Sequence, residues 1–306
     1  MTRLERFDVR SRKLFPGKLR GERRSKQRGQ SVEFEDYRNY VPGDDLRFID
    51  WNVYARLERL FIKIFLEEED LALHIALDAS ASMDTGTPNK LLCTAQLAMA
   101  LGYIGLVKQN RVGLSVFGRP GVAGVARLPD QRGRHQTSRL ASFLLDEVWR
   151  GRDGGSTHGG APGPGAGFND ALTTIARMRV GKGVMVVLSD FLVDDGYQAG
   201  LRALGAAGGY DTYCLQVLSP SEVDPERESE AGVAGDLRLT DVETGRAAEV
   251  TLTAPVIKRY KERLQAYCAE LGSYCLAREM THQLVRSDVE IERLLLDTLR
   301  RHGMVG

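Results

Sequence analysis

One run of side chains in this sequence has the types and spacing to bind a metal ion. The run Asp78-Ala-Ser-Ala-Ser82 directly follows an apolar segment, residues 71–77, of the kind that forms a buried parallel strand. Alternate residues of an extended chain face the same side, so Asp78, Ser80 and Ser82 can converge on one point. A carboxylate and two hydroxyls are oxygen ligands suited to a hard divalent cation.

Two further places along the chain supply oxygen atoms. A glycine-rich loop at residues 151–167 contains Thr157, whose hydroxyl it can present. A second apolar segment, residues 184–188, is followed by Ser189 and Asp190. Ligands of open α/β sheets bind at the carboxyl ends of strands, so these groups are expected near Asp78. Two carboxylates and three hydroxyls together predict a site for Mg²⁺, or for Mn²⁺.

Helix capping is the alternative explanation for the same residues. Asp and Ser are favoured at helix N-termini, and capping would account for Asp78, Ser80 and Ser82 alone, or for Ser189 and Asp190 alone. The two clusters taken together with the loop threonine favour the metal site.

From residue 71 onward, strand-like and helix-like segments alternate. Apolar or alternating runs predict strands, and apolar residues spaced three and four apart predict helices. Strands are expected at residues 71–77, 111–117, 122–128, 184–188, 211–218 and 273–280, and helices at residues 89–109, 135–149, 168–179, 197–207, 254–271 and 288–302. This alternation predicts an α/β fold with a mostly parallel sheet and helices on both faces.

An insertion is expected within this α/β domain, near residues 219–253. Its first part, residues 219–230, is polar and acidic and is predicted to be a loop. Its second part, residues 236–252, has the pattern of a hairpin with Glu243-Thr-Gly-Arg246 at its middle.

The first seventy residues differ in pattern from the rest. Residues 31–38 and 59–66 alternate in character as strands do, and turn residues at 41–45 lie between them. The predicted organisation is a β-rich N-terminal arm, residues 1–70, followed by the α/β domain, residues 71–303.

The bulk composition is that of a globular protein without a strong charge. The chain has 306 residues, 42% hydrophobic and 27% charged, with a formal net charge of +1, which gives no general reason to expect nucleic acid. The exception is residues 1–28, where eleven Lys and Arg face three Asp and Glu. Nucleic-acid binding through this basic terminus stays an alternative beside a solvated terminus.

The expected compartment is the cytoplasm. The four cysteines lack a C-x-x-C pair and predict neither a zinc ribbon nor a disulfide framework. The first residues are charged and lack an apolar signal core. The longest apolar run, residues 95–107, is too short and interrupted to span a bilayer and predicts a buried helix, so no membrane insertion is expected.

Three features occur in order along the chain: D-x-S-x-S after a buried strand, a loop threonine, and a later strand followed by Asp. Together they resemble the metal-ion-dependent adhesion site (MIDAS) of von Willebrand factor A domains. The resemblance implies that Asp78, Ser80, Ser82 and Thr157 surround the ion and that Asp190 acts through water. The long loop at residues 158–167 departs from the family pattern, so Ser156 remains the alternative to Thr157 as the loop ligand.

A second motif, residues 38–51, with Ala55-Arg56 and Glu67-Glu-Glu69, resembles a bacterial family of uncharacterised von Willebrand factor A-like proteins encoded beside MoxR-type AAA+ ATPases. The resemblance covers most of the chain and implies a non-enzymatic, chaperone-like adaptor. Its expected partners are the MoxR-type ATPase, a client protein, or both, joined by a partner carboxylate that completes the metal site.

A metal-dependent phosphoester hydrolase is the alternative from another class, since oxygen-ligated Mg²⁺ also serves phosphoryl transfer. Such an enzyme needs a base beside the ion, and His158 is the candidate. His74 lies inside an apolar strand and is expected to be a packed core histidine. Because His158 is more simply explained as an exposed loop residue, a non-enzymatic protein is expected.

The role of the polar residues in the arm motif stays open between two interpretations. They can form an internal network of turns and salt bridges that docks the arm on the α/β domain, which we favour, or they can be a recognition surface. The residues concerned are Asp44, Asp45, Arg47, Asp50, Trp51 and Arg56.

Overall fold

A computed structural model of the chain describes residues 7, 9, 34–65, 71–149, 166–178, 181–226, 236–240, 247–251, 253–301 and 304. The predicted loop ligand Thr157, its alternative Ser156 and the candidate base His158 lie outside the described residues.

The chain divides into two compact units. One, the arm, comprises Leu14–Asp70, and the other, the α/β unit, comprises Met1–Lys13 together with Leu71–Gly306. The first residues of the chain thus group with the α/β unit, and Val9 is buried in its core.

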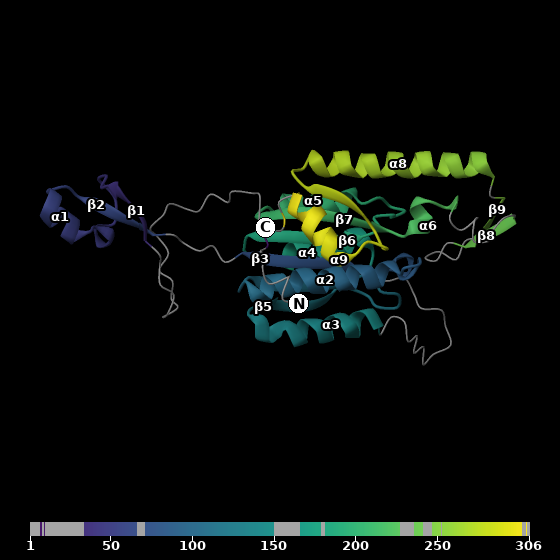
Figure 1. Ribbon diagram of the computed structural model, residues 1–306, viewed down its shortest axis with the longest axis horizontal. Coiled ribbons are helices and arrows are strands. Elements are labelled where there is room, and N and C mark those ends of the chain that lie inside the picture. Colours follow the sequence, from purple (N-terminus) through teal and green to yellow (C-terminus); the bar gives the residue numbers. More distant parts are fainter. Residues whose placement is uncertain are drawn as a thin grey trace. The chain divides into compact units, whose positions relative to one another are not determined.

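The α/β unit is built on one six-stranded sheet with the order β10-β7-β6-β3-β4-β5 (Figure 1). Neighbouring strands are parallel except β5, which pairs antiparallel with β4. This confirms the predicted α/β fold with a mostly parallel sheet. The strands are β3 (Ala72–Asp78), β4 (Arg111–Phe117), β5 (Ala126–Gln131), β6 (Gly183–Ser189), β7 (Tyr210–Leu218) and β10 (Thr281–Arg286).

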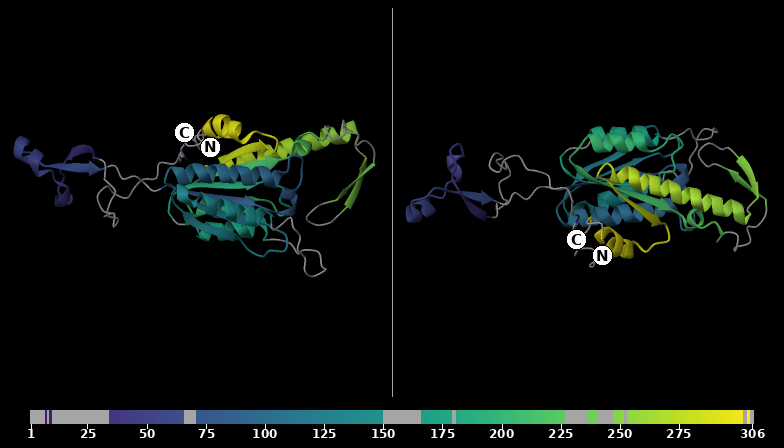
Figure 2. Two further views of the ribbon diagram at one scale, coloured as in Figure 1. Left: turned by 60° about the horizontal axis from the view of Figure 1, so that its bottom comes forward. Right: turned by 90° about the horizontal axis from the view of Figure 1, so that it is seen from above.

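Helices cover both faces of this sheet (Figure 2). One face is covered by α2 (Lys90–Val107), α3 (Thr137–Trp149) and a C-terminal helical segment, which consists of α9 (Ile291–Arg293) and the π-helical stretch Leu294–Leu299. On the other pack α4 (Phe168–Met178), α5 (Gln198–Ala206) and α8 (Ala254–Leu276). The predicted hairpin is present as β8 (Asp236–Thr240) and β9 (Ala247–Thr251).

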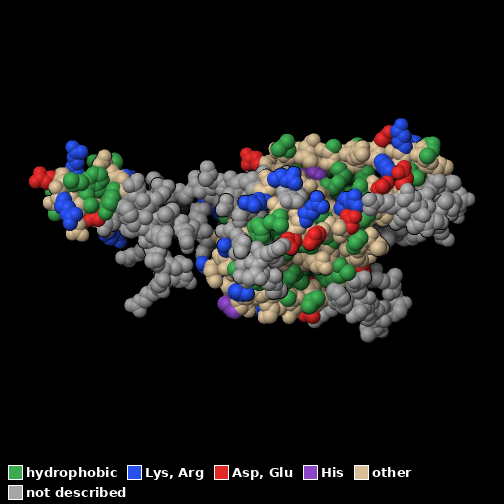
Figure 3. Space-filling model, in the orientation of Figure 1, with side chains coloured by type: hydrophobic (Ala, Val, Ile, Leu, Met, Phe, Trp, Pro, Cys, Tyr) green, Lys and Arg blue, Asp and Glu red, His purple; other side chains and the backbone are tan. Residues whose placement is uncertain are grey.

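The described residues of the arm form a two-stranded antiparallel sheet, a 3-10 helix (Leu46–Phe48) and a short α-helix. Strand β1 (Phe34–Asn39) pairs with β2 (Phe61–Phe65), which confirms the predicted strands, and α1 (Trp51–Leu57) lies between them in sequence. Hydrophobic side chains gather on the surface of this unit (Figure 3), and Trp51 is 60% exposed.

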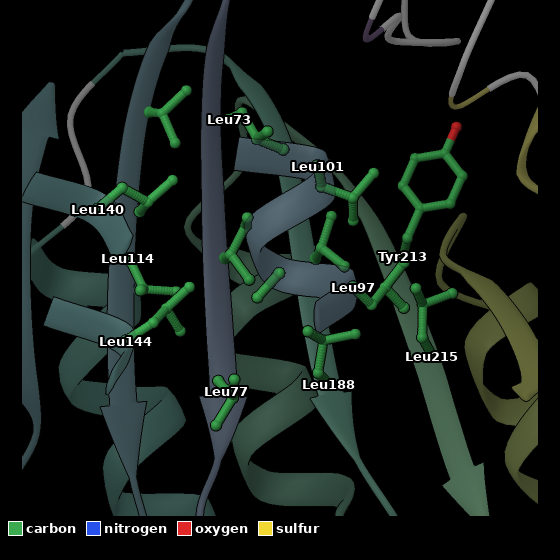
Figure 4. Close-up of a cluster of buried hydrophobic side chains, with 14 of the residues drawn as sticks. Leu73, Leu77, Leu97, Leu101, Leu114, Leu140, Leu144, Leu188, Tyr213 and Leu215 are labelled. Atoms are coloured by element: carbon green, nitrogen blue, oxygen red, sulfur yellow. The ribbon is translucent and has the colours of Figure 1, made fainter. Parts of the chain in front are cut away.

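Successive side chains of β3 point to opposite faces of the sheet, and they belong to two separate layers of the core. Leu73, Ile75 and Leu77 belong to the cluster on the α2 side of the sheet, drawn in Figure 4, whereas Ala72 and Ala76 belong to the cluster on the opposite side. Both faces of the strand are therefore covered, as its continuous apolar run requires.

Two sequence expectations about buried groups are confirmed. His74 is a packed core residue, since it is 3% exposed and its Nε2 lies 2.9 Å from Ser115 Oγ. The apolar run at residues 95–107 lies in the buried helix α2. The expectation that this run is too short to span a bilayer is wrong by length: among the described residues, α2 is the one helix long and apolar enough to cross a membrane, and 67% of it is buried inside the protein.

Two predicted boundaries on the C-terminal side are wrong. The helix predicted to end at residue 271 continues to Leu276, and the strand predicted at residues 273–280 begins only at Thr281. The reason is that Leu271 and Cys275 are buried against the sheet while Ser273, midway between them, is exposed. In a strand all three side chains would share one face, whereas in a helix residues four apart share a face and the residue between them does not.

Two smaller corrections concern the connections. Strand β5 begins at Ala126 instead of residue 122, because Gly121 and Gly124 adopt positive φ angles and end the turn late. The predicted loop after β7 contains a short helix, α6 (Pro220–Val223), which the reciprocal capping box between Ser219 and Glu222 stabilises.

Candidate metal site

The Asp78 carboxylate lies buried at the carboxyl end of β3, between the ends of two neighbouring strands. Asp78 pairs in register with Phe117 of β4. On the other side of β3, the preceding residue, Leu77, pairs with Leu188 of β6. Asp78 Oδ1 accepts a 3.0 Å hydrogen bond from the Ser80 amide, and Oδ2 accepts one of 2.6 Å from Ser189 Oγ. The side chain is therefore held in one orientation by the two chain segments beside it.

The hydroxyls of Ser80 and Ser82 lie 3.1 Å apart, Oγ to Oγ. The turn that contains Ser82 is fixed by Thr85, whose hydroxyl donates a 2.6 Å hydrogen bond to the Ser82 carbonyl oxygen. Ser80 precedes this turn but its side chain makes no capping hydrogen bond there, and the side chain that caps α2 is Asn89. Capping thus does not explain why Ser80 and Ser82 are paired.

Asp190 follows β6 directly and is 2% exposed. Its Oδ1 accepts a 3.1 Å hydrogen bond from the Leu192 amide, and its Oδ2 accepts one of 3.1 Å from Lys90 Nζ. The Gln216 side chain donates to the Asp190 carbonyl oxygen at 3.0 Å. No helix begins at this loop, since α5 starts at Gln198, so helix capping is not the role of Asp190 either.

The two carboxylates interact unfavourably. Burial, reinforced by the negative charge of Asp190, raises the pKa of the Asp78 carboxyl from 3.8 to about 7, while the hydrogen bonds from Ser189 and Ser80 oppose the shift. Buried carboxylates that repel each other are stabilised by a bound cation. The charge arrangement therefore favours a positive ion beside Asp78.

Gly118, directly after β4, makes room for the Asp78 side chain. Its φ is +77°, and a Cβ atom at this position would lie 2.7 Å from Asp78 Oδ1 and 3.1 Å from the Ser80 amide nitrogen. Only glycine satisfies both the backbone conformation and the close approach. Gly118 therefore shapes the edge where Asp78 and Ser80 meet.

The residues fit a hard divalent ion by their chemistry. Asp78, Ser80, Ser82 and Asp190 present carboxylate and hydroxyl oxygens, the donors that Mg²⁺ and Mn²⁺ prefer. Among the described residues, no three His, Cys, Asp or Glu side chains group in a way that could hold a metal ion. The fit thus depends on hydroxyls and water as well as on carboxylates.

The structure brings four of the five predicted ligands to one edge of the sheet, and the fifth, Thr157, lies outside the described residues. Sequence reasoning missed Lys90, Glu222 and Gly118. A lysine at the first position of a helix was a usable signal, because a positive charge is disfavoured there. A glycine directly after a predicted strand was the corresponding signal for Gly118.

The polar residues of the arm motif make contacts within the arm. Arg38 and Asp44 form a two-pronged ion pair at 2.7 Å, and Asp45 pairs with Arg47. Asp50 caps α1 by accepting from the Asn52 and Val53 amides, and it also accepts from the Tyr37 hydroxyl at 3.0 Å. These acidic side chains therefore stabilise turns and the helix start of the arm itself.

The fold and the site define a class of protein: an α/β domain with a mostly parallel sheet whose carboxyl edge gathers two buried carboxylates and several hydroxyls. The chain belongs to the family described as "Protein of unknown function DUF58", whose model matches residues 36–269.

Mycobacterial proteins are also similar to this chain. The chain is similar to "Uncharacterized protein Rv1480" of Mycobacterium tuberculosis (strain H37Rv), with 26% identity over 273 residues, which are 88% of this chain and 79% of the relative. It is also similar to "Uncharacterized protein MAV169" of Mycobacterium avium, with 26% identity over 48% of this chain and 77% of the relative.

Two solved structures resemble the chain distantly. The conserved hypothetical protein BatB from Bacteroides thetaiotaomicron matches with a TM-score of 0.41 and 15% identity over 76% of this chain and 98% of BatB. An aerotolerance-related membrane protein from Bacteroides fragilis matches with a TM-score of 0.36 and 17% identity over 63% and 87% of the two chains. At these TM-scores neither likeness carries an argument about function.

Proposed function

We propose that this chain is a non-enzymatic adaptor of the von Willebrand factor A type that binds a partner protein through a divalent metal ion. The ion is Mg²⁺ or Mn²⁺, with Asp78, Ser80, Ser82 and Thr157 around it and Asp190 acting through water. The resemblance of the arm motif supports a MoxR-type AAA+ ATPase, a client protein, or both as partners, in chaperone-like assembly or maturation.

The observation that carries the proposal is the buried Asp78 carboxylate at the meeting point of β3, β4 and β6. It is 4% exposed, and it lies in the same cluster as the Ser80 and Ser82 hydroxyls and the second carboxylate, Asp190. The Lys90 ammonium group pairs with Asp190, whereas Asp78 accepts hydrogen bonds from neutral groups, so a cation beside Asp78 would offset its buried negative charge.

The protein residues would divide the work of binding. Asp78 supplies the negative charge, and its orientation is held by Ser189 and the Ser80 amide. Ser80 and Ser82 supply neutral oxygens, so they leave most of the positive charge of the ion uncompensated. When bound, the ion offers a position at which a Glu or Asp carboxylate of the partner replaces water. Binding of the partner would then depend on the metal.

Metal binding is tested by titrating Mg²⁺ and Mn²⁺ into the purified chain in a calorimeter. The wild type is expected to bind one ion, and Asp78→Ala is expected to bind none. Asp146→Ala, which removes an exposed carboxylate of α3, is the matched control and should bind as the wild type does. Equal binding by the wild type and Asp78→Ala would contradict the assigned site.

Partner binding is tested by pull-downs with a MoxR-type ATPase and with candidate client proteins, in Mg²⁺ and in EDTA. The expected result is capture that requires Mg²⁺ and is lost in Asp78→Ala but kept in Asp146→Ala. Capture that ignores both the chelator and Asp78→Ala would overturn the metal-bridged mechanism. Turnover of a generic phosphoester that disappears in Asp78→Ala would replace the adaptor with a hydrolase.

A further inference from the structure

A buried lysine forms an ion pair with Asp190, one of the two carboxylates of the candidate metal site. Lys90 is the first residue of α2, and its side chain has no exposed surface. Its Nζ lies 3.1 Å from Asp190 Oδ2 and 2.6 Å from Glu222 Oε1. The ammonium group therefore bridges two carboxylates that come from different loops, one after β6 and one after β7.

Helix stability does not explain a lysine at this position. The N-terminal end of a helix carries a partial positive charge, so a cation there is destabilising. Burying an ammonium group is also unfavourable unless it is paired. Lys90 has both disadvantages, and its two ion pairs offset them. The carboxylate that it holds, Asp190, is one of the two at the candidate site.

Lys90 and a metal ion would compete for the same carboxylate. Asp190 Oδ1 already accepts from the Leu192 amide, and Oδ2 accepts from Lys90. An ion bound directly to Asp190 would share this carboxylate with the Lys90 ammonium group, and the two positive charges would repel each other. The ammonium charge would also repel a divalent ion beside Asp78. Both effects weaken cation binding at the site.

We propose that Lys90 is a positioning residue that restrains Asp190 from direct coordination and thereby sets a weak, exchangeable affinity of the site for divalent cations. The proposal rests on the proposed function for the location of the ion. Glu222 shares the ammonium group with Asp190, so Glu222 moderates how strongly Lys90 holds Asp190. The two residues are thus expected to affect cation affinity in opposite directions.

The test compares Mn²⁺ and Mg²⁺ affinities of the wild type, Lys90→Met and Glu222→Gln by calorimetry. Lys90→Met is expected to bind Mn²⁺ about tenfold more tightly, the scale on which residues behind a metal site change affinity. Glu222→Gln is expected to bind more weakly, because Lys90 then pairs with Asp190 alone. Gln at this position retains the capping box of α6. Lys108→Met, at the exposed far end of α2, is the control and should match the wild type.

A purely structural role for Lys90 would change stability without this pattern of affinities. Lys90→Met that binds Mn²⁺ no more tightly than the wild type overturns the proposal. If Lys90→Met does not fold, the affinity of Glu222→Gln tests the proposal instead. Binding of Mn²⁺ by Glu222→Gln that is as tight as that of the wild type, or tighter, would then contradict the proposal. Binding by Lys90→Met with none by the wild type would refute the proposed function but support this inference. Absence of binding in all variants would refute both.

Discussion

Ser189 Oγ donates a 2.6 Å hydrogen bond to Asp78 Oδ2 and accepts one of 3.0 Å from the Phe191 amide. The serine is fully buried, and it joins the carboxyl ends of β6 and β3 at the point where the candidate site begins. The orientation of the Asp78 carboxylate therefore depends on a residue more than a hundred positions away in the sequence.

Replacing Ser189 by Ala is expected to lower the free energy of unfolding by about 1–3 kcal/mol, because a buried carboxylate oxygen then lacks its partner. Urea denaturation followed by circular dichroism measures the change. Ser273→Ala, which removes an exposed hydroxyl of α8, is the control and should change stability by less than about 0.5 kcal/mol. Equal effects of the two substitutions would contradict the role of Ser189.

Gly118→Ala is expected to impair the site beyond the strain of its backbone. The positive φ alone costs about 1–2 kcal/mol for a residue with a Cβ atom. At Gly118 the added atom also meets Asp78 Oδ1 at 2.7 Å, whereas at Gly124, with a φ of +97°, it meets nothing within 4 Å. Calorimetric Mg²⁺ titration should show weaker binding by Gly118→Ala and unchanged binding by Gly124→Ala. Loss of binding in both variants would indicate a general effect of strain.

Stability without metal is expected to depend on pH through Asp78. Its pKa is about 7 in the folded protein against an ordinary value of 3.8, so the folded state holds the proton more tightly. This contribution is fully present below about pH 4 and is lost as the pH rises through 7, at up to about 1.4 kcal/mol per pH unit. Urea denaturation in EDTA should show this decline in the wild type, and Asp78→Asn should lack it. A parallel decline in both would exclude Asp78 as its source.

Asp50→Ala is expected to destabilise the arm. The substitution removes the cap of α1 and the acceptor of the Tyr37 hydroxyl, and loss of a cap costs about 1 kcal/mol. Asp50→Asn retains a capping side chain and should have a smaller effect. Fluorescence of Trp51 during urea denaturation, measured in a Trp149→Phe background, reports on this unit. If Asp50→Ala and Asp50→Asn unfold at the same urea concentration, the cap is not the stabilising contact.

Local pattern was sufficient for most of the fold. Nearly continuous apolar runs at residues 71–77 and 184–188 predicted β3 and β6, since strands covered on both faces are apolar at almost every position. The strand predicted at residues 273–280 failed because the segment is apolar in part, and only its packing against the sheet shows that α8 continues to Leu276.

The site was predictable only as far as residue types follow strands. Asp78 and Asp190 stand directly after apolar runs, so their position at the sheet edge follows from the rule for open α/β sheets. Lys90 follows no strand, and its unfavourable position at a helix start marks it as unusual without indicating its partners. Its partners Asp190 and Glu222 are 100 and 132 residues away in the sequence. They contact Lys90 only because the fold places the start of α2 beside the segments that follow β6 and β7.

By itself, the sequence determined the elements, the mostly parallel α/β sheet and the clusters of oxygen donors, because periodicity and strand ends are local properties. Only the tertiary structure decided which donors face one another, that Ser189 orients Asp78, and that Lys90 holds Asp190. Burial is the physical reason. It raises the pKa of Asp78, and it makes the Lys90 ammonium group unfavourable unless carboxylates pair with it, as Asp190 and Glu222 do. Burial arises only when the segments pack together at the sheet edge, so no single segment of the sequence shows it.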